Sequence, residues 1–333
     1  MEILETFDAD RMRSLMDNGE RFWLRLHAPK PEVMEQVGAL LHLDHLAVED
    51  SIEFGQRPKI DDYPESALLV FYGARTAHHP DGTTGLVPTE FHFHITEHAI
   101  VSVRRHNADS SQDVRRRVKL DDIDTAEEVL YRVLDAIAST FAPGLQAIDD
   151  EVDALEDRIL EDPETEQRMR LLAIKHSLLA VRQVISAQRD VLAGRREVLE
   201  TLPGFSDSDG RESLRDIYDR IAIVSQQVDN VRESVSNALD LYVSAVANEL
   251  NQIIKVLTIV ATFFLPLTFV TGFFGQNFGW LVRHVTSPGA FVLLGLGINV
   301  MVVTGLWTWL SRAGYVDWHE FLGRGGRRTA KRP

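Results

Sequence analysis

Asn277 carries the most specific chemistry in this sequence. It ends the tripeptide Gly275-Gln276-Asn277, which lies near the end of an uncharged stretch, Val256–Val282. A small, strongly hydrated dication gives up its waters reluctantly and is best bound with those waters in place. Amide and backbone carbonyl oxygens repeated around a symmetry axis accept hydrogen bonds from such waters without a charged trap that blocks release. The pattern therefore predicts a cation contact at Asn277, with Gly275 letting the backbone approach the axis.

A stripe of small, aliphatic and hydroxylated residues leads to this motif along one face of a predicted helix. Its members are Ile254, Thr258, Ala261, Leu265, Thr268, Gly272 and Gly275. Thr268 offers a second polar ring, whereas Ile254, Leu257 and Leu265 are candidates for hydrophobic constrictions. A second set is expected to face lipid or another span: Ile253, Val256, Ile259, Phe263, Leu267 and Phe274. Small residues also mediate helix packing in membranes, and that alternative stays open.

Two uncharged stretches predict a membrane hairpin. Val256–Val282 and Val285–Ser311 are each long enough to span a bilayer, which takes about 20 apolar residues in a helix. Lys255 precedes the hairpin, Arg312 and five further Lys or Arg residues follow it, and Arg283 lies in the connection. Because positively charged flanks stay on the cytoplasmic side, we expect a multi-pass protein of the cell inner membrane with both termini cytoplasmic.

A seven-residue apolar repeat precedes the first span. One line of the repeat holds Leu214, Ile221, Val228, Val235 and Tyr242, and the other holds Ile217, Val224, Val231, Ala238 and Ala245. A sustained heptad predicts partner helices. Continued to Phe274, the helix has about 60 residues and a length of roughly 90 Å. We favour a symmetric bundle of several chains, and packing of the helix on its own chain is the alternative.

The fold class expected from these patterns is an α+β membrane protein. A cytoplasmic α/β head carries a long helical stalk that continues into the first of two transmembrane helices. The expected parts are an α/β head over 1–124, an antiparallel helix pair of the head over 125–205, a stalk helix over 210–255, a two-helix transmembrane hairpin over 256–311, and a cytoplasmic basic tail over 312–333.

Within the head, alternating and periodic apolar patterns predict individual elements. We expect strands at Phe22–Leu26, Ala67–Tyr72, Thr89–Ile95 and Ala99–Arg104, a helix at Glu32–Leu41, and a turn at Pro80–Gly82. Thr125 and Glu128 have the spacing of a capping box, so a helix should begin there. We expect that helix to pause near Pro143-Gly144 and end at about Leu160, and a second to run from about Pro163 to Leu202.

Charge is distributed unevenly along the chain. Residues 251–333 carry 8 Lys and Arg and 2 Asp and Glu, a net charge of +6, so residues 1–250 carry −21 of the total of −15. An acidic head argues against nucleic acid as a partner, because nucleic-acid binding needs a basic surface. It suits a body that attracts cations. The chain contains no cysteine and no Walker A pattern, and we expect no enzymatic activity.

The histidines suggest a direct metal interpretation. His92 and His94 are two residues apart on a predicted strand and therefore share a face, and His78-His79 lies near the preceding turn. Imidazole is a common zinc ligand. Two strand histidines without a third and fourth ligand are more often ordinary surface side chains, so both interpretations are kept.

Several segments together resemble the CorA family of divalent-cation transporters. The first span holds Thr258-Ile-Val-Ala-Thr-Phe-Phe-Leu-Pro-Leu-Thr-Phe269 and then Thr271-Gly-Phe-Phe-Gly-Gln-Asn277, where the family has a Gly-Met-Asn tripeptide. The resemblance extends to Leu46–Asp50, Gln56–Ile60 and Gln188–Leu192. It implies a homopentamer in a lipid bilayer, with stalk and first span lining a central pore, and no cofactor beyond the divalent cation carried as substrate.

The resemblance also implies roles for individual residues. Asn277 becomes the selectivity residue of the Gly275-Gln276-Asn277 motif, Thr268 a deeper ion-contact ring, and Asn251 a polar ring at the cytoplasmic end. The implied constriction positions are Ile254, Leu257 and Leu265. Asp216 and Asp219 resemble the stalk segment in which family members bind regulatory divalent ions between subunits.

Two departures from the magnesium pattern keep the substrate open. Gln276 replaces Met, and Phe278–Ser287 contains no carboxylate but does contain Arg283. Zinc-transporting relatives of the ZntB type vary the middle residue of the tripeptide. The favoured function is a channel or transporter for Mg²⁺, with Co²⁺ and Ni²⁺ as further substrates. The alternatives are a ZntB-like Zn²⁺ transporter and a membrane-anchored signalling or scaffold protein.

Overall fold

The computed structural model describes residues 1–78, 84–105, 126–194, 198, 208–276, 279–284 and 287–314. These residues form two compact units, Met1–Ala245 and Val246–Pro333. The boundary lies within one helix, α9 (Ser208–Phe274), which has 67 residues and a proline, Pro266, in its interior.

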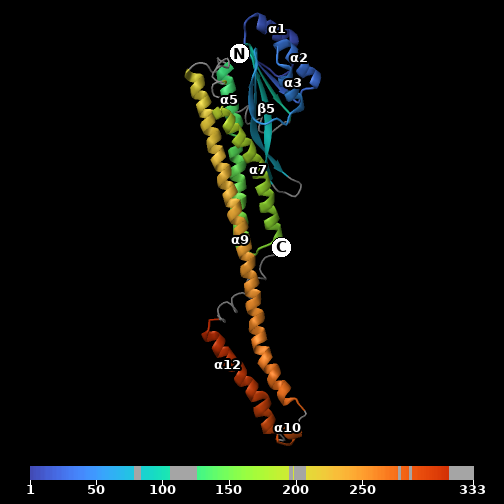
Figure 1. Ribbon diagram of the computed structural model, residues 1–333, viewed down its shortest axis with the longest axis vertical. Coiled ribbons are helices and arrows are strands. Elements are labelled where there is room, and N and C mark those ends of the chain that lie inside the picture. The colour runs from blue at the N-terminus through green and yellow to red at the C-terminus, as the bar shows by residue number, and fades with distance from the viewer. Residues whose placement is uncertain are drawn as a thin grey trace, which may run out of the picture. The chain divides into compact units, whose positions relative to one another are not determined.

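The first unit is built on a six-stranded sheet (Figure 1). Its strands are β1 (Glu2–Leu4), β2 (Phe22–His27), β3 (Lys59–Asp62), β4 (Ala67–His78), β5 (Thr84–Ile95) and β6 (Ala99–Arg104). Their order across the sheet is β1-β2-β6-β5-β4-β3. The β1, β2 and β6 strands are parallel, and the remaining pairs are antiparallel.

The predicted strands of the head are confirmed, and two of them are longer than expected. The β4 strand continues past Tyr72 because Gly73–His78 pairs with Thr84–Thr89. The predicted turn at Pro80–Gly82 lies outside the described residues, as does His79. The predicted helix at Glu32–Leu41 is confirmed as α2 (Pro31–Leu41).

Helices cover both faces of the sheet because side chains alternate along each strand. Phe22, Leu24 and Leu26 pack in one core with α1 (Ala9–Asp17) and α2. A third short helix, α3 (His45–Glu53), packs against α2 on that side (Figure 1). The opposite face packs on α5 (Ala126–Ala138), α6 (Phe141–Glu161) and α7 (Thr165–Gly194).

The expected pause at Pro143-Gly144 is wrong by a few residues. The break lies at Ser139-Thr140, between α5 and α6, and Pro143 falls in the first turn of α6, where its missing N–H is not needed. The Thr140 hydroxyl accepts a hydrogen bond of 2.8 Å from the Ala74 amide of β4 and donates one to the Ile137 carbonyl. Docking on the sheet therefore sets the position of the break. Thr125 lies outside the described residues, so the predicted capping box cannot be placed.

The heptad seam of α9 is buried inside its own chain, and our favoured interpretation of it as a contact between chains is wrong. Val228 and Ile221 are completely buried and belong to the same core as Val152 of α6 and Leu178 of α7. The seam is buried from Leu214 to Ala238, and Tyr242 and Ala245 are partly buried against it. Because α6 and α7 are long enough to flank α9, one chain supplies the partner helices that the repeat requires.

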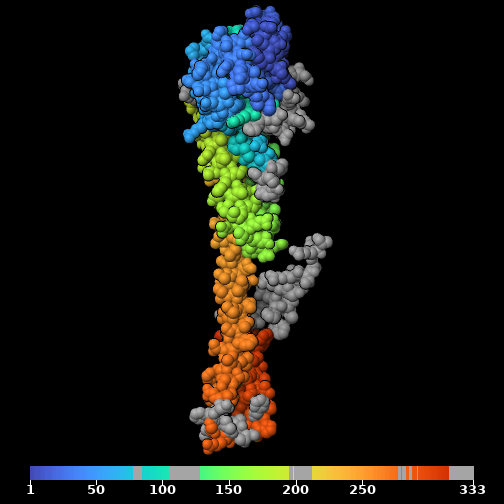
Figure 2. Space-filling model, turned by 90° about the vertical axis from the view of Figure 1, so that its right-hand side faces the viewer, coloured from blue at the N-terminus to red at the C-terminus, as the bar shows by residue number. Residues whose placement is uncertain are grey.

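The second unit contains the remainder of α9 and a returning series of helices: α10 (Gly279–His284), α11 (Pro288–Phe291), the π-helical segment η2 (Val292–Gly297) and α12 (Ile298–Arg312). The α12 helix lies beside the C-terminal part of α9 in both views (Figure 1, Figure 2). Two helices, Glu212–Phe274 and Pro288–Arg312, are long and apolar enough to cross a membrane.

Candidate functional site

The tripeptide Gly275-Gln276-Asn277 begins directly after α9, which ends at Phe274. The Gly275 amide donates a hydrogen bond of 2.9 Å to the Thr271 carbonyl, and the Gln276 amide donates one to the Phe273 carbonyl. A Cβ atom on Gly275 would lie 2.9 Å from the Thr271 carbonyl oxygen, closer than side-chain carbons approach such an atom. Glycine is therefore required for this close approach of the backbone. Asn277 lies outside the described residues.

Its own chain leaves the predicted stripe of α9 uncovered, together with residues outside the stripe such as Phe264 and Phe269, which are 65% and 71% exposed. Ile254, Leu257 and Leu265 are 51%, 67% and 74% exposed. Thr258, Ala261, Thr268, Gly272 and Gly275 are exposed as well. Of the residues expected on the other face, four are half-buried: Ile259, Phe263, Leu267 and Phe274. Ile253 and Val256 are exposed. The described part of the chain therefore does not cover these two residues, which we expected to face lipid or another span.

The threonine hydroxyls along this helix bond to their own backbone. Thr268 donates a hydrogen bond of 2.8 Å to the Phe264 carbonyl, and Thr258 donates one of equal length to the Ile254 carbonyl. An apolar surrounding tolerates a hydroxyl whose proton is used in this way. The oxygen keeps its lone pairs, so Thr268 can still accept a hydrogen bond from a water that accompanies a cation.

Asn251 extends the same face toward the N-terminal side of the span. It is exposed and lies three residues before Ile254, which places the two side chains on adjacent turns of one face. Its amide can accept and donate hydrogen bonds without carrying charge. Asn251, Ile254 and Thr268 thus lie along a single uncovered line of α9.

The two stalk acids have different surroundings in the protomer. Both carboxylates are exposed, and the Tyr131 hydroxyl of α5 donates a hydrogen bond of 2.7 Å to Asp216. Burial together with this carboxylate raises the pKa of Tyr131 to about 12. Among the described residues no group of three His, Asp or Glu side chains is arranged to hold a metal ion. A regulatory cation at Asp216 or Asp219 would therefore need ligands beyond the side chains described here.

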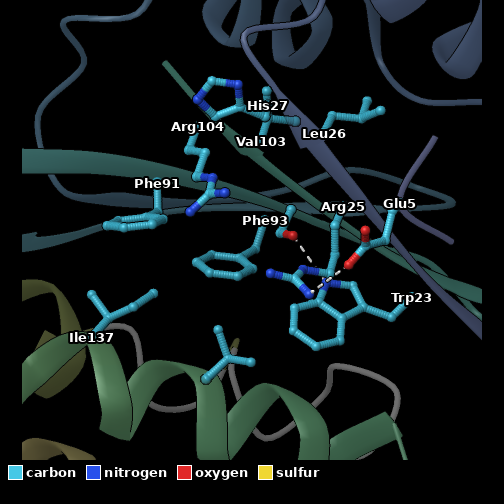
Figure 3. A pocket seen from close by; sticks show the side chains of 12 residues that line it. Glu5, Trp23, Arg25, Leu26, His27, Phe91, Phe93, Val103, Arg104 and Ile137 are labelled. Atoms are coloured by element: carbon cyan, nitrogen blue, oxygen red, sulfur yellow. Dashed lines mark hydrogen bonds and ion pairs between the residues drawn. The ribbon is translucent and has the colours of Figure 1, made fainter. Parts of the chain in front are cut away.

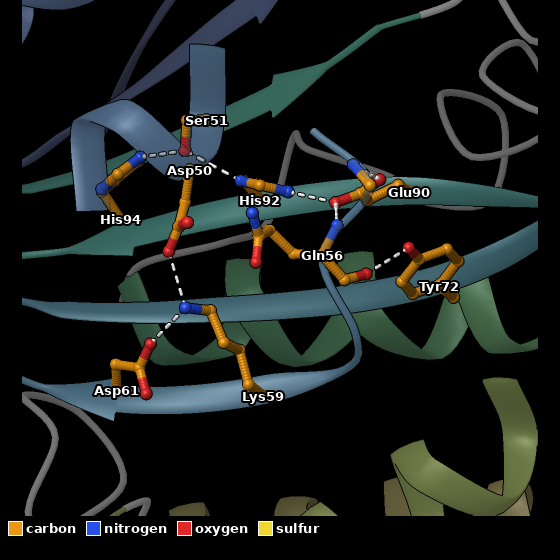
Figure 4. A network of polar contacts seen from close by, with 10 residues as sticks. Asp50, Ser51, Gln56, Lys59, Asp61, Tyr72, Glu90, His92 and His94 are labelled. Atoms are coloured by element: carbon orange, nitrogen blue, oxygen red, sulfur yellow. Dashed lines mark hydrogen bonds and ion pairs between the residues drawn. The ribbon is translucent and has the colours of Figure 1, made fainter. Parts of the chain in front are cut away.

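His92 and His94 form a buried network and are not surface side chains (Figure 4). The Ser51 hydroxyl of α3 lies 2.8 Å from His92 Nδ1 and 2.8 Å from His94 Nε2. On its other side, His92 Nε2 lies 2.7 Å from the Glu90 carboxylate. The expectation of exposure is wrong because these residues project from β5 toward α3. Ser51 and Glu90 hold both nitrogens of His92 and Nε2 of His94, and the zinc interpretation finds no third ligand group in the described part of the chain.

The network defines its own proton positions. With a proton on His92 Nε2 for the Glu90 carboxylate, His92 Nδ1 accepts the Ser51 proton, and the Ser51 oxygen accepts the proton of His94 Nε2. Nδ1 of His94 has no hydrogen-bond partner among the described atoms. Burial lowers the pKa of His94 to about 3, with a further contribution from His92. Burial raises the pKa of Glu90, but hydrogen bonds from His92, Gly55 and Gln56 outweigh this effect and hold it below its usual value.

Ser51 and Glu90 are residues whose part in this network we did not foresee. Ser51 precedes His92 by 41 residues in the sequence, so no local pattern connects the two. Two-residue alternation could have paired Glu90 with His92 and His94 on one strand face.

Together, these features define a membrane protein: an α/β domain and two apolar helices, the first of them continuous with a helix of that domain and ending in a glycine-dependent turn. The chain belongs to the family of CorA-like Mg²⁺ transporter proteins, whose model matches residues 18–312. The predicted family and the predicted fold class are both confirmed.

Individual relatives extend over most of the chain. It is 29% identical to the cobalt/magnesium transport protein CorA of Thermotoga maritima over 310 residues, which cover 90% of this chain and 86% of that protein. It is 25% identical to the zinc transport protein ZntB of Klebsiella pneumoniae over 302 residues, or 90% of this chain and 89% of that protein. The structure of the CorA magnesium transporter from Methanocaldococcus jannaschii has the same fold, with a TM-score of 0.74 at 20% identity over 88% of this chain and 91% of that one.

Proposed function

We propose that this protein is a CorA-type divalent-cation channel or transporter that moves Mg²⁺ across the inner membrane. The observation that carries this proposal is the uncovered face of α9, which combines polar, small and apolar residues and leads to the glycine-dependent turn at Gly275. A face of this composition suits a pore better than lipid, because Asn251 and Thr268 supply oxygen acceptors along its length.

One chain cannot enclose a pore with a single helix face, so the proposal includes a homo-oligomer. A pentamer is the assembly that the family resemblance implies. Copies of α9 would surround a common axis, with α12 on the outside facing the lipid. The flanking Lys and Arg residues favour cytoplasmic N- and C-termini.

Within such a pore the residues would act in series. Asn277 of the Gly275-Gln276-Asn277 motif would accept hydrogen bonds from the waters of the entering cation, and Thr268 and Asn251 would repeat this contact deeper in. Ile254, Leu257 and Leu265 would form dry constrictions that close the path when the bundle narrows. The membrane potential supplies about 4.6 kcal/mol for a dication at about 100 mV, since each charge contributes roughly 2.3 kcal/mol. Passive flow needs no nucleotide hydrolysis.

One of the two alternatives has specific support. Gln276 in the tripeptide and the absence of a carboxylate from Phe278–Ser287 favour a ZntB-like Zn²⁺ transporter over the Mg²⁺ type, which could also carry Co²⁺ or Ni²⁺. The similarity to relatives named for cobalt and magnesium and for zinc fits either substrate. A membrane-anchored signalling or scaffold protein would use the hairpin for attachment only.

Ion flux into liposomes that contain only this protein tests the proposal. We expect saturable uptake of Mg²⁺, and measurements with Zn²⁺, Co²⁺ and Ni²⁺ establish the preference. Asn277→Ala should abolish uptake with the oligomer intact by native mass spectrometry. Asn299→Ala is the matched control, because that amide lies in α12 and donates to the Gly295 carbonyl of its own helix. Flux of no cation would support the scaffold alternative, a preference for Zn²⁺ would support the zinc transporter, and unchanged flux in Asn277→Ala would reject Asn277 as an ion contact.

A further inference from the structure

A cavity of about 110 Å³ lies between the sheet and α5, away from the proposed pore residues (Figure 3). Its wall on the sheet side includes Trp23, Phe91 and Phe93, and α5 contributes Val133 and Ile137. It lies toward the carboxyl ends of β2 and β6. Ligands of α/β proteins often bind outside the carboxyl ends of parallel strands.

Strand register brings two guanidinium groups to this cavity. Arg25 of β2 is opposite Ser102 of β6, and His27 is opposite Arg104, so all four residues share one sheet face. On the antiparallel side, Phe91 is opposite Arg104. Figure 3 shows the Arg104 side chain pointing into the space above Phe93, with Arg25 on the other side of that ring. Two residues far apart in the sequence thereby present cationic groups to one enclosed space.

Arg25 is held in place from two directions. Its guanidinium carbon lies 5.1 Å from the centre of the Trp23 ring, and its side chain is only 16% exposed. One nitrogen lies 3.5 Å from the Glu5 carboxylate, which is mostly exposed. The pair is long and its carboxylate partner is mostly exposed, so an anion that reaches Arg25 can displace Glu5. The Ser102 hydroxyl accepts a hydrogen bond of 2.9 Å from the Trp23 indole, which leaves its own proton available to an acceptor.

We propose that this cavity binds a small organic anion, with its carboxylate or phosphate group between Arg25 and Arg104 and its apolar body against Phe91, Phe93 and Ile137. Guanidinium groups pair with planar oxyanions through two parallel hydrogen bonds, and Ser102 can donate a third. The aromatic wall offers an apolar surface, and it favours an organic ligand over a bare inorganic ion. The lining places the guanidinium donors of Arg25 and Arg104 beside one cavity, and these donors can pair with an anion although the head as a whole is acidic. This inference does not depend on ion transport.

Thermal unfolding and calorimetric titration of the full-length protein in detergent test the proposal. The probes are benzoate, phenyl phosphate, inorganic phosphate and neutral benzyl alcohol. We expect saturable binding of benzoate or phenyl phosphate, weaker binding of inorganic phosphate, and none of benzyl alcohol. The organic anion that binds more tightly shows whether the cavity prefers a carboxylate or a phosphate group. Absence of saturable binding of both at concentrations up to about 10 mM, or equal binding of benzyl alcohol, would overturn the proposal.

Variants distinguish specific anion binding by the two arginines from a general effect of positive charge. Arg104→Gln should weaken binding of the preferred anion by about tenfold or more, because one charge-assisted pair is lost. Arg105→Gln is the matched control, since Arg105 is the next residue and its guanidinium carbon lies 6.0 Å from the Phe54 ring, outside the cavity. Glu5→Gln removes the group that competes for Arg25 and should strengthen binding. The assigned geometry would be contradicted by an equal loss of affinity in Arg104→Gln and Arg105→Gln, or by weaker binding in Glu5→Gln. Because these two outcomes come from different variants, one of them still tests the geometry when another variant folds poorly.

Discussion

The Gly275 amide donates to the Thr271 carbonyl oxygen at 2.9 Å, and a Cβ atom on Gly275 would lie just as close to that same oxygen. The final turn of α9 therefore excludes a side chain at the first position of the tripeptide. Any larger residue must move the backbone that leads to Asn277.

We predict that Gly275→Ala slows cation flux by roughly tenfold or more, because relieving the contact costs about 1–3 kcal/mol of rearrangement at the pore entrance. Radioisotope or fluorescent-dye uptake into liposomes measures the effect. Gly305→Ala in α12 is the matched control, since a Cβ there meets no atom within 4 Å. Equal flux in the two variants would show that the turn at Gly275 does not position the ion path.

We predict that Val228→Asp unfolds the head itself. Val228 is completely buried among α6, α7 and α9, so an unpaired carboxylate there should cost about 3–5 kcal/mol. Ile223→Asp on the same helix is the control, because Ile223 is 60% exposed. Circular dichroism during heating should show a large loss for Val228→Asp and a folded head for Ile223→Asp. A folded Val228→Asp protomer that fails only to assemble would restore the interchain interpretation of the heptad.

We predict that the head loses stability on mild acidification through His94. The folded-state pKa of His94 is about 3, below its usual 6.5, so below pH 6.5 the unfolded chain binds a proton that the folded chain does not. His94 therefore leaves the free energy of unfolding unchanged above pH 6.5. Below pH 6.5 that free energy falls progressively toward pH 3, by up to about 1.4 kcal/mol per pH unit.

Urea denaturation at pH 7 and pH 5 measures this loss. The depressed pKa of Glu90 acts mainly below its usual 4.5, so this window isolates the histidine contribution. His94→Gln keeps a donor for Ser51 and should show a smaller decrease between the two pH values. His176→Gln serves as the control because that histidine is exposed. An acid loss that is the same in His94→Gln and the wild type would place the responsible group elsewhere.

We predict that Mg²⁺ protects the head from proteolysis through Asp216, if this carboxylate binds an ion together with groups from a neighbouring chain. Asp216→Asn should raise the Mg²⁺ concentration for half-protection by about tenfold, since a charged oxygen ligand is lost. Flux at high internal Mg²⁺ should rise in the same variant, because an ion that favours the closed state no longer does so.

The Tyr131→Phe variant distinguishes protection by a bound ion from protection by the hydrogen bond to Asp216. It removes the 2.7 Å donor to Asp216 and keeps the carboxylate, so Mg²⁺ protection should persist or occur at lower concentration. Loss of protection in Tyr131→Phe alone would indicate that the hydrogen bond, and not an ion, stabilises this region. The regulatory hypothesis would be rejected if millimolar-range Mg²⁺ changed neither the proteolysis nor the flux of the wild type.

Local patterns in the sequence were sufficient for several of the elements. The strand predicted at Ala99–Arg104 is reproduced residue for residue in the structure, and the uncharged stretch after Val256 predicts the apolar end of α9. These features depend on burial periodicity and bilayer thickness, which act on neighbouring residues. The tripeptide that ends at Asn277 was similarly readable, because its chemistry depends on residue types next to one another.

Only the tertiary structure decided which surfaces meet. A heptad has the same spacing whether its partner helix belongs to another chain or to the same one, and the packing of Val228 against α6 and α7 resolved that choice. His92 and His94 alternate like surface residues, yet α3 covers them and supplies Ser51 as their common partner. Arg25 and Arg104 converge because two parallel strands are adjacent in the sheet. Long-range contacts of this kind depend on how elements dock, and no short stretch of sequence carries that information.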